Sequence, residues 1–206
     1  MATTSAPYGI RPVNRLGAQS FAGATRLYAI PSGYAVSIQT GDPVIVTNTG
    51  STRGTVARMN ATTTATTITS TGGGFGFVGV FMGCTYTDPV FGKIFRQTYP
   101  AGTVASDIQA YVADDPDQVF QIQADEALNQ TALGCNASLI QTVAGSSGYV
   151  ASGLGLDASS IATANTLPLR IVDFVTIGDA FTDVLVRINT HFHRTGNTGS
   201  AGTAVS

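Results

Sequence analysis

The 206-residue sequence predicts an all-β protein: a compact β-barrel or β-sandwich with an extended N-terminal arm and little helix. Composition is the first reason. The chain has 29 threonines, which are β-branched and favour strands, but only one lysine, Lys93, and one glutamate, Glu126, both good helix formers. The second reason is pattern. Apolar runs of roughly four to eight residues alternate with Gly, Pro, Asn and Asp, which is typical of sandwiches and barrels.

The sequence predicts that the arm comprises residues 1–23. Pro7 and Pro12 bracket its centre, and proline disfavours helix at the preceding residue and cannot donate a ladder hydrogen bond. The segment is therefore extended or turning. It carries anchor side chains, so we expect it to lie against another surface rather than move freely. The anchors are Tyr8, Ile10, Val13 and Leu16.

The sequence predicts a β domain over residues 24–194. A division of this domain into two subdomains near residues 125–165 is left open. Within 75–82, glycine alternates with bulky residues, which lets another backbone or a ring approach one face of the strand. The expected strands are 25–30, 34–38, 44–47, 54–59, 75–82, 93–99, 108–112, 119–123, 169–174 and 184–192.

Three connecting segments complete the expectation. The acidic turn at residues 114–117 separates two strand-like runs and predicts a hairpin over 108–123. Residues 144–166 are small and predict a loose region, and the best helical candidate is short, at 125–130. The Gly/Ser/Thr-rich residues 195–206 predict a flexible C-terminal tail.

Charge and hydropathy argue against several functions. Only 11% of residues are charged and the net charge is −2, with the nine arginines dispersed, so we expect no direct nucleic-acid partner. No run of about 18 apolar residues exists, and we expect no membrane partner. The first residues have no signal-peptide pattern, which predicts cytoplasmic synthesis with Cys84 and Cys135 as reduced thiols. A weakly charged surface offers little repulsion between copies, which suits a permanent assembly.

Two groups of side chains are candidate metal ligands. His191 and His193 form an H-x-H pair that shares one face of a strand, and Asp114, Asp115 and Asp117 supply the oxygens that hard cations prefer. Neither group has a recognisable set of remaining ligands, and EF-hand spacing is missing. We expect an unliganded histidine pair, a solvated acidic turn, and no metal or cofactor.

No catalytic motif stands out. The glycine-rich residues 72–76 lack the G-K-[ST] of a phosphate loop, and the hydrolase elbow G-x-S-x-G does not occur. We therefore expect no enzyme. A cleft that gathered Asp107, Asp173 or Asp183 with a histidine would revive the enzymatic alternative.

Three segments, Tyr28 to Val44, Val104 to Asp125 and Gly178 to His191, together resemble small virion structural proteins of tailed bacteriophages and cyanophages, of the head cement or decoration type. The opening Pro7 to Val13 is also typical of that group. The resemblance covers most of the chain, and residues 50–74 and 144–166 match least.

The resemblance implies a non-enzymatic protein on the outer surface of the capsid, made in the host cytoplasm. Such proteins bridge neighbouring subunits of the major capsid protein after the shell expands, often as homotrimers. The arm, with Tyr8, Ile10, Arg11 and Val13, would then dock on a neighbouring capsid or cement subunit. The alternatives are another virion structural role, in a tail or head fibre, and a carbohydrate-binding β module, which the absence of tryptophan disfavours.

Overall fold

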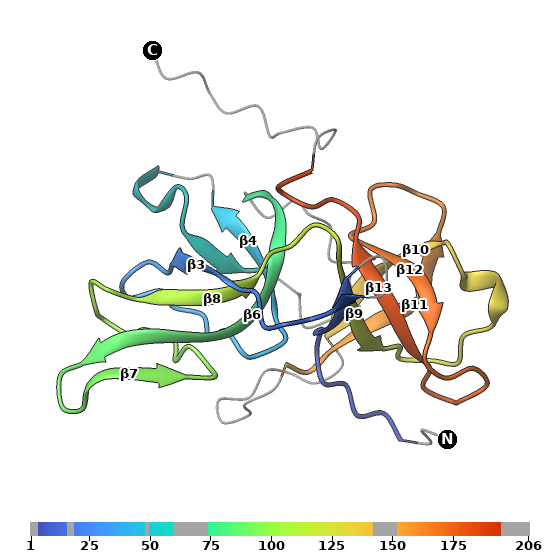
Figure 1. Ribbon diagram of the computed structural model, residues 1–206, viewed down its shortest axis with the longest axis horizontal. Helices are drawn as coiled ribbons and strands as arrows, with labels where there is room; N and C mark the ends of the chain where they lie inside the picture. Colours follow the sequence, from blue (N-terminus) through green and yellow to red (C-terminus); the bar gives the residue numbers. More distant parts are fainter. Residues whose placement is uncertain (1–3, 16–18, 48–49, 60–73, 142–151, 195–206) are drawn as a thin grey trace, which may run out of the picture.

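The computed structural model describes residues 4–15, 19–47, 50–59, 74–141 and 152–194 (Figure 1). Over these ranges the protein consists almost entirely of strands, arranged in two antiparallel sheets that pack together as a β-sandwich. The all-β prediction is confirmed. The predicted tail, 195–206, lies outside the described residues.

Sheet I has seven strands in the order β11-β10-β12-β13-β9-β1-β2. Their bounds are β1 (Arg11–Arg15), β2 (Gln19–Ser20), β9 (Gln118–Gln123), β10 (Asn136–Gln141), β11 (Leu154–Ala162), β12 (Leu169–Phe174) and β13 (Asp183–Ile188).

Sheet II has six strands in the order β3-β8-β6-β4-β5, with β7 pairing the far end of β6. Their bounds are β3 (Arg26–Ala29), β4 (Pro43–Thr47), β5 (Val56–Arg58), β6 (Gly74–Asp88), β7 (Gly92–Arg96) and β8 (Gln109–Ala113). Two short 3-10 turns, Gly50–Thr52 and Gln130–Ala132, lie between strands.

Sheet II is covered on both faces, which explains the nearly continuous apolar run in β6. Phe77 and Val80 point into the core between the two sheets. Val78 and Phe81 point to the other face, into a second core that includes Tyr99 from a loop. A strand buried on both faces reads as uniformly apolar rather than alternating.

The glycines of β6 provide the close approach that the sequence predicts. A Cβ atom at Gly79 would overlap the backbone carbonyl of Ala113 on β8. Gly83 has φ +144°, and a Cβ there would lie 2.6 Å from Cζ of Phe95. Glycine is therefore required at both positions, by a neighbouring backbone in one case and by an aromatic ring in the other.

The predicted hairpin over residues 108–123 is wrong. β8 pairs with β3 and β6 in sheet II, whereas β9 pairs with β13 and β1 in sheet I. The acidic segment 114–117 therefore carries the chain from one sheet to the other. Local turn chemistry predicts a change of direction, but it does not tell which strand the next segment will pair with.

Three other local predictions also need correction. Residues 154–162 are not loose but form β11, whose small residues pair with β10. Residues 34–38 form only an isolated bridge, Ile38 to Tyr99. The helical candidate at 125–130 is replaced by the later 3-10 turn, where the Asn129 side chain caps the first turn by accepting from the N–H of Thr131.

The N-terminal segment is joined to the sandwich from residue 6 onward, where the N–H of Ala6 donates to Oε1 of Gln123 at 2.9 Å. The N–H of Gly9 donates to the carbonyl of Leu154, the N–H of Ile10 donates to that of Gly41, and β1 pairs with β9. The Ile10 side chain is 1% exposed and belongs to the core between the sheets.

Candidate functional site

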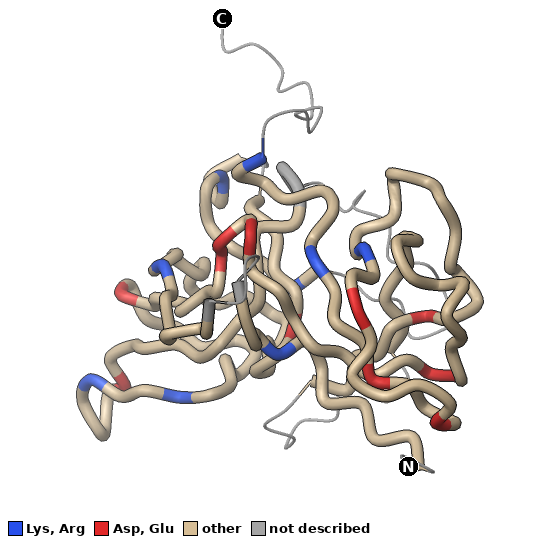
Figure 2. Tube along the Cα trace, turned by 45° about the vertical axis from the view of Figure 1, so that its right-hand side comes forward, with Lys and Arg blue, Asp and Glu red and all other residues tan. Residues whose placement is uncertain are grey.

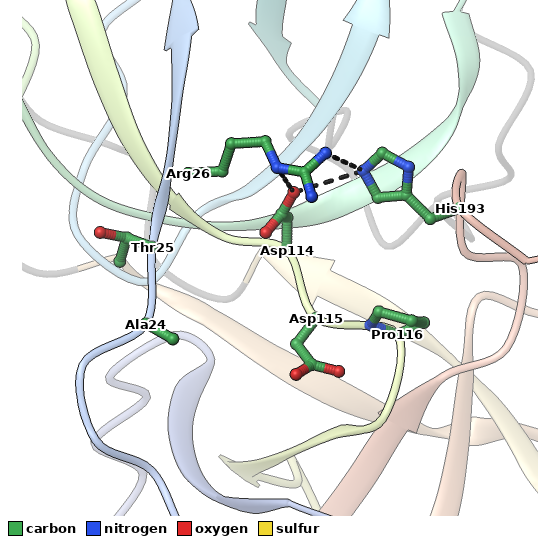
Figure 3. A pocket seen from close by; sticks show the side chains of 7 residues that line it. All are labelled: Ala24, Thr25, Arg26, Asp114, Asp115, Pro116 and His193. Atoms are coloured by element: carbon green, nitrogen blue, oxygen red, sulfur yellow. Dashed lines mark hydrogen bonds and ion pairs between the residues drawn. The ribbon is translucent and has the colours of Figure 1, made fainter.

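Two segments cross from one sheet to the other at the same place in the sandwich. One is the link between β8 and β9, residues 114–117. The other is the stretch after β13, where His191 bridges Phe77 of β6 and the N–H of Phe192 donates to the Phe77 carbonyl at 2.8 Å. The crossing brings His193 to Asp114, 79 positions away in the sequence (Figure 3).

Asp114 is the centre of this cluster. Its Oδ2 lies 3.1 Å from Nε of Arg26, accepts a 2.7 Å hydrogen bond from the hydroxyl of Tyr28, and lies 3.3 Å from Nε2 of His193. Arg26 and Tyr28 reach it together because residues i and i+2 of β3 share a face. Burial and the hydrogen bond to Asp114 raise the pKa of Tyr28, so the phenol stays a donor.

Asp117 anchors the other end of the link. Its Oδ1 accepts from Nη2 of Arg187 on β13 at 2.9 Å and from Nη2 of Arg194 at 2.8 Å. The predicted solvated turn is therefore wrong for Asp114, which is buried and paired. It is also incomplete for Asp117, which is exposed but holds two arginines.

The histidine pair is split between two environments. His191 is fully buried, and its Nδ1 accepts from the N–H of His193 at 3.1 Å. Burial, followed by the neighbouring His193, lowers the pKa of His191 to about 4. His191 is therefore neutral at pH 7, while His193 faces Asp114 and a surface pocket (Figure 3).

The pocket beside His193 has a volume of about 430 Å³. It is lined by Ala24, Thr25, Arg26, Asp114, Asp115, Pro116 and His193. Within the described ranges, no group of three or more His, Cys, Asp or Glu side chains lies close enough to hold a metal ion. The Arg26 guanidinium instead forms an ion pair with Asp114. The arrangement is thus an ion-pair network at a junction of the two sheets.

The aspartates considered for an enzymatic cleft lie elsewhere. Asp107 accepts from the N–H and hydroxyl of Thr87, and Asp183 accepts from Tyr8. Asp173 accepts the N–H of the next residue. None of these contacts joins one of the three aspartates to a histidine.

The predicted interface residues make contacts within the chain. The Tyr8 hydroxyl donates to Oδ1 of Asp183 at 2.8 Å, and burial together with this bond raises the pKa of Tyr8. The Arg11 guanidinium lies 4.2 Å from the centre of the Tyr8 ring, a cation–π contact, and Val13 is half-buried on β1. Ile10 is in the core, so it could reach a neighbour only if the segment left the sheet. Docking by these residues stays a prediction.

Sequence reasoning missed the exposed apolar surface. The sequence does not tell how far sheet I extends over sheet II. Large apolar side chains are exposed at Leu27, Val36, Val90, Phe91, Phe95, Val104, Leu133, Val175 and Ile177.

Comparison with known proteins identifies no relative of this chain: no known family, curated protein or solved structure matches it. Among the described residues, no helix has the length and apolar character needed to span a membrane. Any assignment of function therefore depends on the geometry and on the sequence resemblance.

Proposed function

We propose that this chain is a non-enzymatic capsid cement protein that binds the outer surface of an expanded phage head and bridges subunits of the major capsid protein. The observation that carries the proposal is the set of large apolar side chains exposed on a weakly charged β-sandwich. Contiguous exposed apolar surface marks sites of protein contact, and Val90, Phe91 and Phe95 gather on the β6–β7 hairpin. The charged and polar side chains around the pocket hydrogen-bond and ion-pair with one another. They are not arranged as a nucleophile, a base and an oxyanion donor.

Only one of the two alternatives, the carbohydrate-binding module, predicts a different surface. A carbohydrate-binding module presents aromatic faces to a sugar, but the pocket lining contains no Phe, Tyr or Trp. A tail or head-fibre component would share the sandwich and its apolar surface, and differs only in where it attaches to the virion. Attachment is therefore the property to measure.

The test is co-sedimentation with expanded phage heads that lack the protein. Arg11→Glu replaces an exposed arginine in the proposed docking segment, and Arg170→Glu, an exposed arginine on β12, is the matched control. We expect Arg11→Glu to weaken binding about tenfold or more, since arginines are common anchors of interfaces. Equal binding by both variants would exclude the segment as the contact. Deleting residues 2–13 is a poorer test, because it removes Ile10 from the core.

A further inference from the structure

Residues 189–194, which follow β13, cross from sheet I to sheet II as a strap (Figure 1). β8 pairs with residues 80–85 of β6 and then leaves the sheet as the 114–117 link. The strap lies beside β6 just beyond that point, where His191 bridges Phe77 and the N–H of Phe192 donates to the Phe77 carbonyl. On its other side Phe77 pairs with Ile45 of β4. The strap therefore covers the part of the β6 edge that β8 leaves open.

The strap is attached by an isolated bridge and by polar side chains, not by a strand ladder. Charged residues are sparse along the chain (Figure 2), yet ion pairs fasten two successive strap residues to the link. Nε2 of His193 lies 3.3 Å from Oδ2 of Asp114, and Nη2 of Arg194 donates to Oδ1 of Asp117 at 2.8 Å. Segments with few backbone bonds open at a lower free energy than the sheets on which they lie. The strap can therefore open while β6 and β13 stay paired.

His191 is the buried centre of the strap. Its side chain is fully buried, and Nδ1 accepts the N–H of His193 at 3.1 Å. Nδ1 therefore carries no proton, and the neutral ring has its proton on Nε2. Nε2 is itself buried without a hydrogen-bond partner among the described residues. A second proton would sit on Nδ1 and face the N–H of His193, so two donors would meet and a charge would be buried.

The groups that face this imidazole come from three elements. Val78 of β6 presents only its backbone carbonyl, and Asp114 of the link presents a carbonyl and a carboxylate, all of which favour the second proton. The carboxylate of Asp114 is already paired with Arg26 and accepts from Tyr28, which weakens its attraction for another charge. Burial and the neighbouring ring of His193 oppose the proton and outweigh these groups, so the pKa of the imidazole falls to about 4.

We propose that residues 189–194 are an acid-released strap, in which protonation of His191 detaches the segment from β6 and from the 114–117 link while both sheets stay folded. The closed strap holds the imidazole neutral, whereas an open strap places it in water, where it takes up a proton readily. Acid therefore populates the open form. Opening uncovers the β6 edge at Phe77 and removes His193 from the pocket lining. This device does not depend on the proposed cement function.

Amide hydrogen exchange of the wild-type protein tests the strap directly. The amides of Phe192 and His193 report on the strap, and those of Ile171 and Phe81, which donate to Cys135 and Asp42, report on sheets I and II. After correction for the intrinsic effect of pH, we expect the opening constant of the strap to rise about 20-fold from pH 7 to pH 5.

Urea separates strap opening from unfolding of the whole protein. The strap amides should be about tenfold or more less protected than the sheet amides at pH 5. Urea below the unfolding transition should leave the strap exchange nearly unchanged and accelerate exchange in the sheets, because local opening exposes little surface.

Two variants assign the pH effect to one histidine. In His191→Asn, the amide oxygen takes the place of Nδ1 as acceptor for the N–H of His193 but does not titrate, so the 20-fold change should disappear. His193→Gln is the matched control, because it keeps an N–H donor for Asp114 and leaves His191 titratable. This variant should keep most of the change.

Four results would overturn the proposal. Strap amides with the protection and urea dependence of the sheet amides would show that the strap and the sheets open as one unit. Strap protection that does not change between pH 7 and pH 5 would exclude acid release. A pH effect that persists in His191→Asn, or that disappears in His193→Gln, would exclude His191 as its origin. If His191→Asn does not fold, the wild-type comparison of strap and sheet amides still decides.

Discussion

Replacing Arg58 should expose how strongly this sandwich depends on one buried ion pair. Asp42 is fully buried, and its Oδ2 lies 3.1 Å from Nε of Arg58, whose side chain is 12% exposed. The same oxygen accepts from the N–H of Gln39 at 2.8 Å. Arg58, at the end of β5, also donates to Oε1 of Gln141 on β10 at 2.9 Å, so it joins the two sheets. Arg58→Met keeps the apolar stem but removes the charge.

The expected loss of unfolding free energy is about 3 to 5 kcal/mol at pH 7, the usual consequence of leaving a buried charge without its partner. Burial raises the pKa of Asp42, while Arg58, Ser152 and Gln39 lower it. Without Arg58 the effect of burial is opposed less, so the folded-state pKa rises further. A carboxyl whose pKa is higher in the folded state makes stability fall as pH rises between the unfolded and folded values. The penalty should therefore be smaller near pH 4 than at pH 7.

Urea unfolding at both pH values, on wild type, Arg58→Met and Asp42→Asn/Arg58→Met, measures this effect. We expect the double variant to regain most of the loss, because the amide is neutral and still accepts from Gln39. A penalty under about 1 kcal/mol at pH 7, as for exposed pairs, would refute the reasoning. So would a double variant no more stable than the single one.

Three further predictions concern packing, pH and thiol reactivity. Gly79→Ala should destabilise the fold by about 3 kcal/mol, because the added Cβ overlaps Ala113. Gly102→Ala is the control: a Cβ there meets no other atom, and the positive φ alone should cost about 1–2 kcal/mol. Equal losses of unfolding free energy in chemical denaturation would contradict the packing argument. Since the pKa of His191 falls to about 4 on folding, stability should drop by about 2 kcal/mol between pH 7 and pH 5. His191→Asn should remove that drop, and an unchanged pH profile would argue against this origin. Burial raises the pKa of Cys84 to about 11, so iodoacetamide should modify the half-buried Cys135 in the native protein and spare Cys84, as mass spectrometry of peptides would reveal.

Fold class and most strands were predictable because they depend on local composition. The alternation of glycine and bulky residues over 75–82 indicated β6, and the close approach that it predicts is present at Gly79. Strand pairing was not predictable in the same way. The sequence around Asp114 is turn-like whether the chain reverses or crosses between sheets, and β11 becomes a strand by pairing with β10 rather than through its own small residues.

The junction site shows the same limit. The histidine pair and the acidic turn were both singled out from the sequence, but as separate candidates. Their contact depends on two crossings between the sheets, and Arg26 and Tyr28 reach Asp114 from 88 and 86 positions away. No spacing rule covers such separations. The exposed apolar residues of the hairpin were missed for a related reason, since exposure depends on where sheet I ends.

Binding of the wild-type protein to expanded phage heads tests the central claim most directly. Heads that lack the protein would be incubated with increasing amounts of it, sedimented, and the bound protein measured. A cement protein should bind saturably, prefer expanded over unexpanded heads, and raise the temperature at which the heads open. Protein that stays in the supernatant at every concentration, with heads no more heat-resistant than before, would contradict the account.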